Sequence, residues 1–135
     1  MKYLLDTNIC IYTIRRRPEE VFRRVEACRI GDIGISSMTY SELCYGVSKS
    51  QVVRRNRAAL ERFVAPLEIL EFGVEAALAC GEVRAALEKK GSPIGPMDLL
   101  IGAHALAAGC VLVTNNTREF ERIPELRVED WVAAG

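Results

Sequence analysis

The chain has 135 residues, of which 50% are hydrophobic and 27% charged, a composition typical of a globular protein with one hydrophobic core. Eighteen basic and eighteen acidic residues give a formal net charge of zero, so the bulk charge does not indicate a nucleic-acid partner. We expect residues 1–135 to form a single domain.

The five cysteines are separated along the sequence and include no Cys-x-x-Cys pair or Cys/His cluster. This spacing argues against a zinc site or a disulfide framework and indicates reduced thiols in a cytoplasmic protein. No apolar run approaches the length needed to span a membrane, and the N-terminus does not resemble a signal peptide. We therefore expect no association with a membrane.

Apolar runs and turn residues predict the following elements in the first half of the chain: a strand ending at Asp6, a helix from Asn8 to about Arg16, a helix beginning at Pro18, a strand over 33–37, and a helix from Thr39 to Ser48. In the second half they predict helices over 51–64, 74–90 and 97–108, strands over 67–72 and 110–113, and an edge strand over 126–128. This alternation favours the α/β class, with a mostly parallel sheet between two layers of helices.

Three acidic residues occupy similar places in this pattern. Asp6 follows the first strand, Glu42 lies near the start of the helix after the second strand, and Asp98 lies in the first turn of the helix over 97–108. Because parallel strands end on one edge of a sheet, Asp6 and Glu42 are expected to converge there. Asp98 precedes a strand, so it joins them only if its helix runs back from that same edge.

Each acid also has a purely structural interpretation. Asp6 is a suitable cap for the helix that follows it, Thr39-x-x-Glu42 matches a capping box, and Asp98 suits the positive end of a helix. Three carboxylates in one crevice would raise each other's pKa, whereas a divalent cation with oxygen ligands would stabilise them together. The sequence therefore allows either three helix caps or one metal site.

The strand over 110–113 is followed by a polar segment that includes Thr114, Asn116 and Glu119. Thr114 and Asn116 could hydrogen-bond the carboxylates or a metal-bound water, and Glu119 could supply a fourth carboxylate; an Asx-turn in a polar loop is an equal alternative. His104 is the only histidine. It lies six positions after Asp98, on another helix face, so we interpret it as structural or surface-exposed.

Four segments together resemble the PIN-domain toxins of VapC type: Leu4–Asn8, Ser41–Gly46, Pro93–Ile101 and Leu112–Phe120. The resemblance implies a PIN-like three-layer α/β/α sandwich and a Mg²⁺- or Mn²⁺-dependent endoribonuclease. It also implies a homodimer that is inhibited by a cognate antitoxin, as the toxin of a toxin–antitoxin pair. The chain departs from the family at Asn116, where many PIN domains carry an aspartate.

The resemblance implies roles for the acidic positions. Asp6 and Asp98 would be direct metal ligands, Glu42 a ligand or a base towards the attacking water, and Asn116 and Glu119 would orient these groups. Phosphodiester hydrolysis by such a site needs no nucleophilic side chain. Structured or looped RNA such as tRNA is a plausible substrate. The arginines expected to bind RNA phosphates are Arg15, Arg16, Arg17, Arg54, Arg55 and Arg57.

Two other functions compete with this hypothesis. A catalytically inactive PIN fold that only binds RNA or protein is the main alternative, because Asn116 replaces an acid. A phospho-receiver module also has acids at strand ends that bind Mg²⁺, but it needs an acceptor aspartate after a central strand and a nearby lysine. The four lysines, Lys2, Lys49, Lys89 and Lys90, do not fit that requirement.

Overall fold

The computed structural model describes residues 1–132 and contains a central sheet whose strands are all parallel. The strands in chain order are β1 (Tyr3–Leu5), β2 (Ile33–Ser36), β3 (Glu68–Leu70), β4 (Val111–Val113) and β5 (Val128–Glu129). They lie in the order β3-β2-β1-β4-β5, so β1 is central. The predicted mostly parallel sheet is confirmed, and in the described part of the chain it is entirely parallel.

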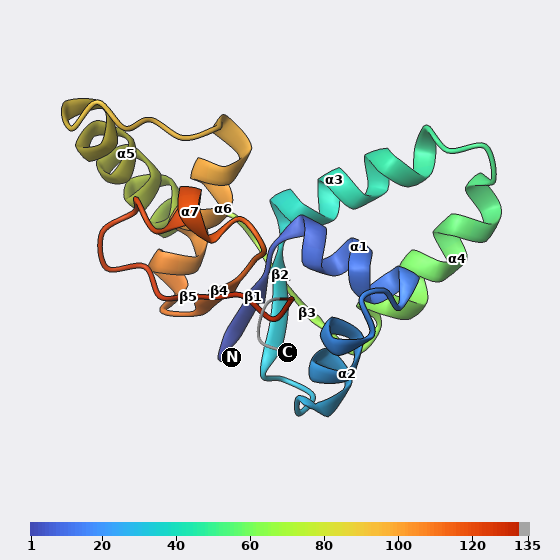
Figure 1. Cartoon of the computed structure of the whole chain (residues 1–135). Helices are drawn as coiled ribbons and strands as arrows, with labels where there is room; N and C mark the ends of the chain where they lie inside the picture. The colour runs from blue at the N-terminus through green and yellow to red at the C-terminus, as the bar shows by residue number, and fades with distance from the viewer. Residues whose placement is uncertain (133–135) are drawn as a thin grey trace.

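Helices cover both faces of this sheet, which gives the predicted three-layer α/β/α sandwich (Figure 1). One layer contains α1 (Thr7–Arg15), α2 (Glu19–Ala27), α3 (Ser37–Ser48) and α4 (Val53–Val64). The other contains α5 (Val74–Lys89), α6 (Pro96–Ala108) and the short α7 (Thr117–Phe120). Within residues 1–132, none of these helices is long and apolar enough to cross a membrane.

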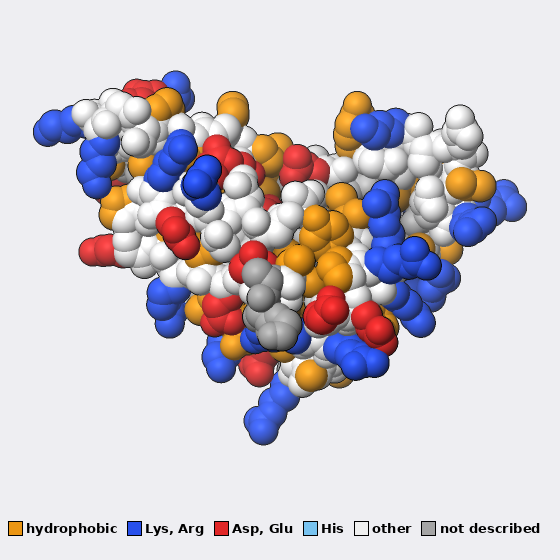
Figure 2. All heavy atoms as spheres, viewed as in Figure 1, with side chains coloured by type: hydrophobic (Ala, Val, Ile, Leu, Met, Phe, Trp, Pro, Cys, Tyr) orange, Lys and Arg blue, Asp and Glu red, His pale blue; other side chains and the backbone are white. Residues whose placement is uncertain are grey.

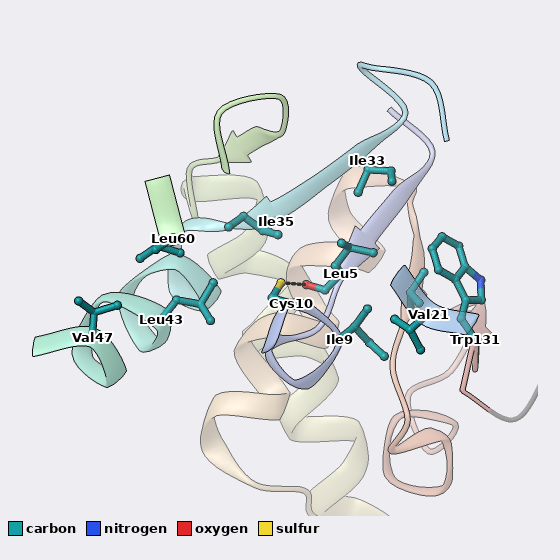
Figure 3. Packing of buried hydrophobic residues seen from close by; sticks show 11 residues of the cluster. Leu5, Ile9, Cys10, Val21, Ile33, Ile35, Leu43, Val47, Leu60 and Trp131 are labelled. Atoms are coloured by element: carbon teal, nitrogen blue, oxygen red, sulfur yellow. Dashed lines mark hydrogen bonds between the residues drawn. The ribbon is translucent and has the colours of Figure 1, made fainter. Parts of the chain in front are cut away.

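The hydrophobic core lies in two clusters, one on each face of the sheet. Leu4 and Leu5 are adjacent and fully buried, yet they belong to different clusters because successive side chains of a strand point to opposite faces. In Figure 3, Leu5 lies near Ile9 of α1, and the Cys10 thiol contacts the Leu5 carbonyl oxygen at 4.0 Å. Burial on both faces explains why β1 is a continuous apolar run instead of an alternating one.

Two helix starts differ from the sequence prediction because of their caps. Asp6 caps α1, which begins at Thr7, one residue before the predicted start. Ser36 caps α3, and its hydroxyl accepts a hydrogen bond from the Met38 amide at 3.1 Å, so α3 begins before Thr39. The predicted capping box between Thr39 and Glu42 is therefore wrong. Among the strands, β3 is shorter than predicted, and β5 begins only at Val128.

The direction of α6 decides what lies at the carboxyl edge of the sheet. Pro96 occupies its first turn, where a missing amide proton is tolerated. Gly109 ends it with φ of 69°, and β4 begins two residues later, at Val111. Because the end of α6 is joined to the start of β4 by so short a connection, its N-terminus lies at the opposite, carboxyl edge (Figure 1).

Gly102 allows α6 to pack closely on the segment that follows β4. A Cβ atom at this position would collide with Ile123 and would lie 3.2 Å from Phe120 Cδ1. Both side chains are buried, so neither can move away easily. Since Phe120 ends α7, this contact fixes the short helix against α6.

We predict that Gly102→Ala destabilises the protein, because overpacking a core costs about 1–3 kcal/mol. The matched control is Gly81→Ala in α5, where an added Cβ meets nothing within 4 Å. That substitution should stabilise by roughly 0.5–1 kcal/mol through helix propensity alone. Thermal melts of both variants test this, and a higher Tm for Gly102→Ala would contradict the close packing.

Candidate active site

Asp6 ends β1 and lies at the floor of the carboxyl edge with only 5% of its surface exposed. Its Oδ1 accepts a hydrogen bond from the Thr7 amide at 2.8 Å, and its Oδ2 accepts one from the Thr114 hydroxyl at 2.7 Å. Burial raises the pKa of Asp6, and these two hydrogen bonds partly offset that effect. Asp6 is therefore both a helix cap and a buried carboxylate at the expected edge.

Glu42 lies in the second turn of α3, one turn further along than the sequence prediction placed it. It is partly buried, and its Oε1 accepts a hydrogen bond from the Thr7 hydroxyl at 2.6 Å. Its charge also contributes to raising the pKa of Asp6. With the capping box excluded, the helix start gives no structural reason for a glutamate here, whereas the contact with the Asp6–Thr7 turn places it at the carboxyl edge.

Asp98 reaches the same edge because α6 starts there. It lies in the first turn of that helix, as predicted. Its pKa is raised to about 7, first by burial, then by a hydrogen bond with Glu119 and by the negative charges of Glu119, Asp6 and Glu42. The helix that carries Asp98 therefore does run back from the carboxyl edge, and Asp98 lies near Asp6 and Glu42.

Asn116 and Glu119 connect α7 to the start of α6. The Gly95 amide donates to Glu119 Oε1 at 2.8 Å, and the Asn116 side-chain amide donates to Glu119 Oε2 at 2.8 Å. The same amide lies 3.5 Å from Asp98 Oδ2. Hydrogen bonds from Asp98, Gly95 and Asn116 lower the pKa of Glu119, so within this pair Asp98 is the group that holds a proton.

The structure thus brings together carboxylates from four different elements. Figure 2 shows acidic side chains along a notch at the top of the molecule, which in Figure 1 lies above the ends of β1 and β2. Within residues 1–132, no three carboxylate, thiol or imidazole side chains are arranged so that they would hold a metal ion as they stand. The donors nevertheless fit a hard divalent cation, because they are oxygen atoms, and burial together with the neighbouring negative charges raises the pKa of Asp6 and of Asp98.

His104 lies apart from these groups. It is 4% exposed, its Nδ1 is 2.8 Å from the Ser36 hydroxyl, and its ring packs edge-on against Phe72. Burial lowers its pKa. The structural interpretation of His104 is therefore confirmed, and the alternative of an exposed histidine is wrong.

The six arginines expected to bind RNA are all exposed but do not surround the carboxylates. Arg15 is the last residue of α1, about 13 Å along the helix from Asp6 at 1.5 Å per residue, and Arg16 and Arg17 follow it. Arg54, Arg55 and Arg57 lie at the start of α4, beyond the far end of α3. Figure 2 shows basic side chains along this flank of the molecule. Any role in RNA binding remains a prediction.

Two of these arginines already have partners in the protein. The Arg16 guanidinium lies 5.0 Å from the centre of the Phe22 ring, and Arg57 donates to the Ser48 hydroxyl at 3.3 Å. Neither contact is buried, so both arginines can also reach a ligand.

The sequence analysis anticipated Thr114 as a partner of the carboxylates but missed Thr7 and Gly95. Thr7 could have been found from its position, because a residue directly after a strand-ending acid lies on the same edge of the sheet. Gly95 contributes only its backbone amide, which no sequence pattern marks.

Comparison with known proteins agrees with this geometry. A family model described as PIN domain matches residues 3–126. The tRNA(fMet)-specific endonuclease VapC of Salmonella typhimurium is 47% identical over 131 residues, covering 97% of this chain and 98% of that protein. Ribonuclease VapC2 of Rickettsia felis is 46% identical over 132 residues, with 97% and 98% coverage.

Solved structures give the same result. The fold matches DNA-bound VapBC from Salmonella typhimurium with a TM-score of 0.91 at 47% identity, covering 97% of this chain and 98% of that one. VapBC2 from Rickettsia felis bound to a promoter DNA fragment matches with a TM-score of 0.89 at 44% identity, covering 97% and 99%. The chain belongs to the PIN-domain family, and within it to the VapC group.

The raised pKa of Asp98 predicts how the stability of the metal-free protein depends on pH. Between its unfolded pKa near 4 and its folded pKa of about 7, the folded state binds this proton more tightly, so the free energy of unfolding falls as pH rises. We expect Asp98→Asn to melt higher than the parent at pH 8 in EDTA, by roughly 4 °C per kcal/mol of relieved repulsion. The difference in Tm should shrink as the pH falls and disappear below about pH 4, where Asp98 is protonated in both the folded and the unfolded state.

Burial lowers the pKa of His104, so this residue makes the free energy of unfolding rise with pH, opposite to the effect of Asp98. Because His104 is present in both proteins, the difference between their Tm values isolates the effect of Asp98. Adding Mg²⁺ at pH 8 should stabilise the parent by about 2.7 kcal/mol at a hundredfold excess over the dissociation constant, and Asp98→Asn by less. A parent that gains nothing from Mg²⁺, beside a variant that melts lower in EDTA, would show that the acids do not form a metal site.

Proposed function

We propose that the protein is a metal-dependent endoribonuclease and the toxin of a type II toxin–antitoxin pair, acting in the cytoplasm as a single nuclease domain. The observation that carries this proposal is the convergence of Asp6, Glu42, Asp98 and Glu119 at one edge of the sheet, with the pKa of Asp98 at about 7. It is supported by 46–47% identity, over nearly the full length, to proteins named as VapC nucleases.

The acidic residues and Asn116 have different roles in the proposed reaction. When bound, Mg²⁺, or Mn²⁺ in its place, would supply an activated water molecule and positive charge opposite the phosphate. Asp6 and Asp98 would hold the ion, and Glu42 would either hold it or accept a proton from the attacking water. Asn116 orients Glu119 and Asp98, to which its side-chain amide is directed. The product is RNA with a 5′-phosphate and a 3′-hydroxyl.

The partners follow from the relatives. Structures of related chains are described as VapBC toxin–antitoxin complexes, some with DNA, and we extend the antitoxin partner to this chain. One curated relative is described as tRNA(fMet)-specific, which supports a structured RNA as substrate. A homodimer is supported by Val74 and Leu78 of α5, which are 77% and 64% exposed one turn apart.

A catalytically inactive PIN fold that only binds RNA or protein is the second candidate. It is favoured by Asn116, which contributes an amide where many family members have a carboxylate. In our proposal, Glu119 partly replaces the carboxylate that is absent at position 116. The Asn116 side-chain amide donates a hydrogen bond to Glu119 Oε2 at 2.8 Å. Metal-dependent cleavage of RNA separates the two candidates.

We predict that Asp6→Asn and Asp98→Asn each lower the cleavage rate by a factor of about 100 or more, because each substitution removes a metal ligand. The measurement is single-turnover cleavage of a labelled tRNA with excess Mg²⁺ and, in parallel, with EDTA. Exposed Glu88 of α5, replaced by Gln, is a control because its carboxylate forms an exposed ion pair with Arg84 of the same helix.

Circular dichroism must show that each variant is folded. Full activity in either aspartate variant would remove that residue from the site. Activity that persists in EDTA would remove the metal from the mechanism.

The exposed arginines of α4 give a separate prediction. Replacing Arg54, Arg55 and Arg57 together with Ala should weaken RNA binding and reduce its dependence on salt, because each lost phosphate contact lowers the slope by roughly 0.7 for single strands. The rate at saturating RNA should stay within about twofold of the parent. Filter binding between 50 and 200 mM salt measures the slope, and an unchanged slope would show that this cluster does not contact RNA phosphates.

A further inference from the structure

Thr7 contacts two carboxylates that belong to different elements. It is the first residue of α1, and its backbone amide donates to Asp6 Oδ1 at 2.8 Å. Its hydroxyl donates to Glu42 Oε1 on α3 at 2.6 Å, across 35 positions of sequence. A length of 2.6 Å is typical of a charge-assisted bond between a hydroxyl and an ionised carboxylate.

The Thr7 hydroxyl also lies near the hydroxyl of Thr39, at a longer distance than to Glu42. Thr39 is buried, and its Oγ1 lies 3.4 Å from Thr7 Oγ1. A hydroxyl has one proton to donate, and an ionised carboxylate can only accept. The Thr7 proton therefore points to Glu42. The Thr39 hydroxyl is then free to direct its own proton toward Thr7 Oγ1.

Glu42 needs such a partner in order to stay at the site. Its long side chain would otherwise rotate away from the negative charges of Asp6 and Asp98, whose pKa values it raises. In the described part of the chain, the bond from Thr7 is the one hydrogen bond that the Glu42 carboxylate receives, and it engages Oε1. Oε2 is thus left without a protein donor and can face an ion or a water molecule.

We propose that Thr7 is a positioning residue that sets the separation between the Asp6 and Glu42 carboxylates by bonding to both. This inference rests on the proposed function, because it assigns Glu42 to the metal site. Thr7 does not touch the reacting atoms. Its backbone amide holds Asp6 as a helix cap would in any protein, whereas its hydroxyl acts only on Glu42.

The test compares three variants. Thr7→Val removes the hydroxyl and keeps the shape and the backbone amide, and Thr7→Ser keeps the hydroxyl. Thr13→Val is the matched control further along α1, because the Thr13 hydroxyl donates only to the Ile9 carbonyl of its own helix. Each variant is assayed for kcat and KM with a labelled tRNA, for Mn²⁺ affinity by calorimetry without RNA, and for Tm.

Loss of a group that orients metal ligands typically costs about 10–100-fold in metal affinity or activity, and we expect Thr7→Val to lose this much in both kcat and Mn²⁺ affinity. The KM for RNA should change less than about twofold, since the RNA-binding surface is intact. Thr7→Ser should recover most of the loss, and Thr13→Val should alter Tm alone.

Equal behaviour of Thr7→Val and the parent would overturn the proposal, and so would equal losses in Thr7→Val and Thr7→Ser. A parent that binds Mn²⁺ but cuts no RNA would refute the proposed function only, because Mn²⁺ affinities of the variants would still decide the role of Thr7. A parent that neither binds Mn²⁺ nor cuts RNA would refute both.

Discussion

The repulsion between carboxylates gathered at one edge of the sheet is the constraint on which the rest of the site depends. Asp6 is nearly buried, and Glu42, Asp98 and Glu119 lie within electrostatic range of it. In metal-free protein, burial first and the neighbouring negative charges next disfavour the charged form of Asp98 and raise its pKa to about 7. Such a grouping persists only if hydrogen bonds and the surrounding core hold the side chains in place.

Hydroxyl and amide groups from both helical layers hold these carboxylates in place by hydrogen bonds. The hydroxyls of Thr7 and Thr114 bind Glu42 and Asp6, while the Gly95 amide and the Asn116 side chain bind Glu119. Each donor comes from a segment that the core fixes, and the cluster around Ile101, Phe120 and Ile123 fixes α6 against α7. The polar edge is thus positioned by the apolar layers beneath it.

A net charge of zero conceals a separation of charge across the surface. Acidic side chains lie along the notch, whereas exposed arginines lie on the flank formed by the end of α1 and the start of α4 (Figure 2). For the proposed RNA substrate, a cation in this notch would offset the charge of the carboxylates, and the arginines would meet phosphates on one flank, away from the cut. Local charge, and not the total, therefore decides what such a protein binds.

The sequence by itself determined the α/β class, the approximate elements, and the place of Asp6, because an apolar run followed by an acid encodes a buried strand and its cap locally. It also determined that His104 and Asp98 lie on different faces of one helix. Only the tertiary structure decided that Asp98 joins Asp6, since that depends on α6 starting at the carboxyl edge and leading directly into β4. The same holds for the loss of the Thr39 capping box to Ser36, and for the bond from Thr7 to Glu42. These contacts join residues distant in sequence, and their geometry is set by how the two helical layers pack on the sheet.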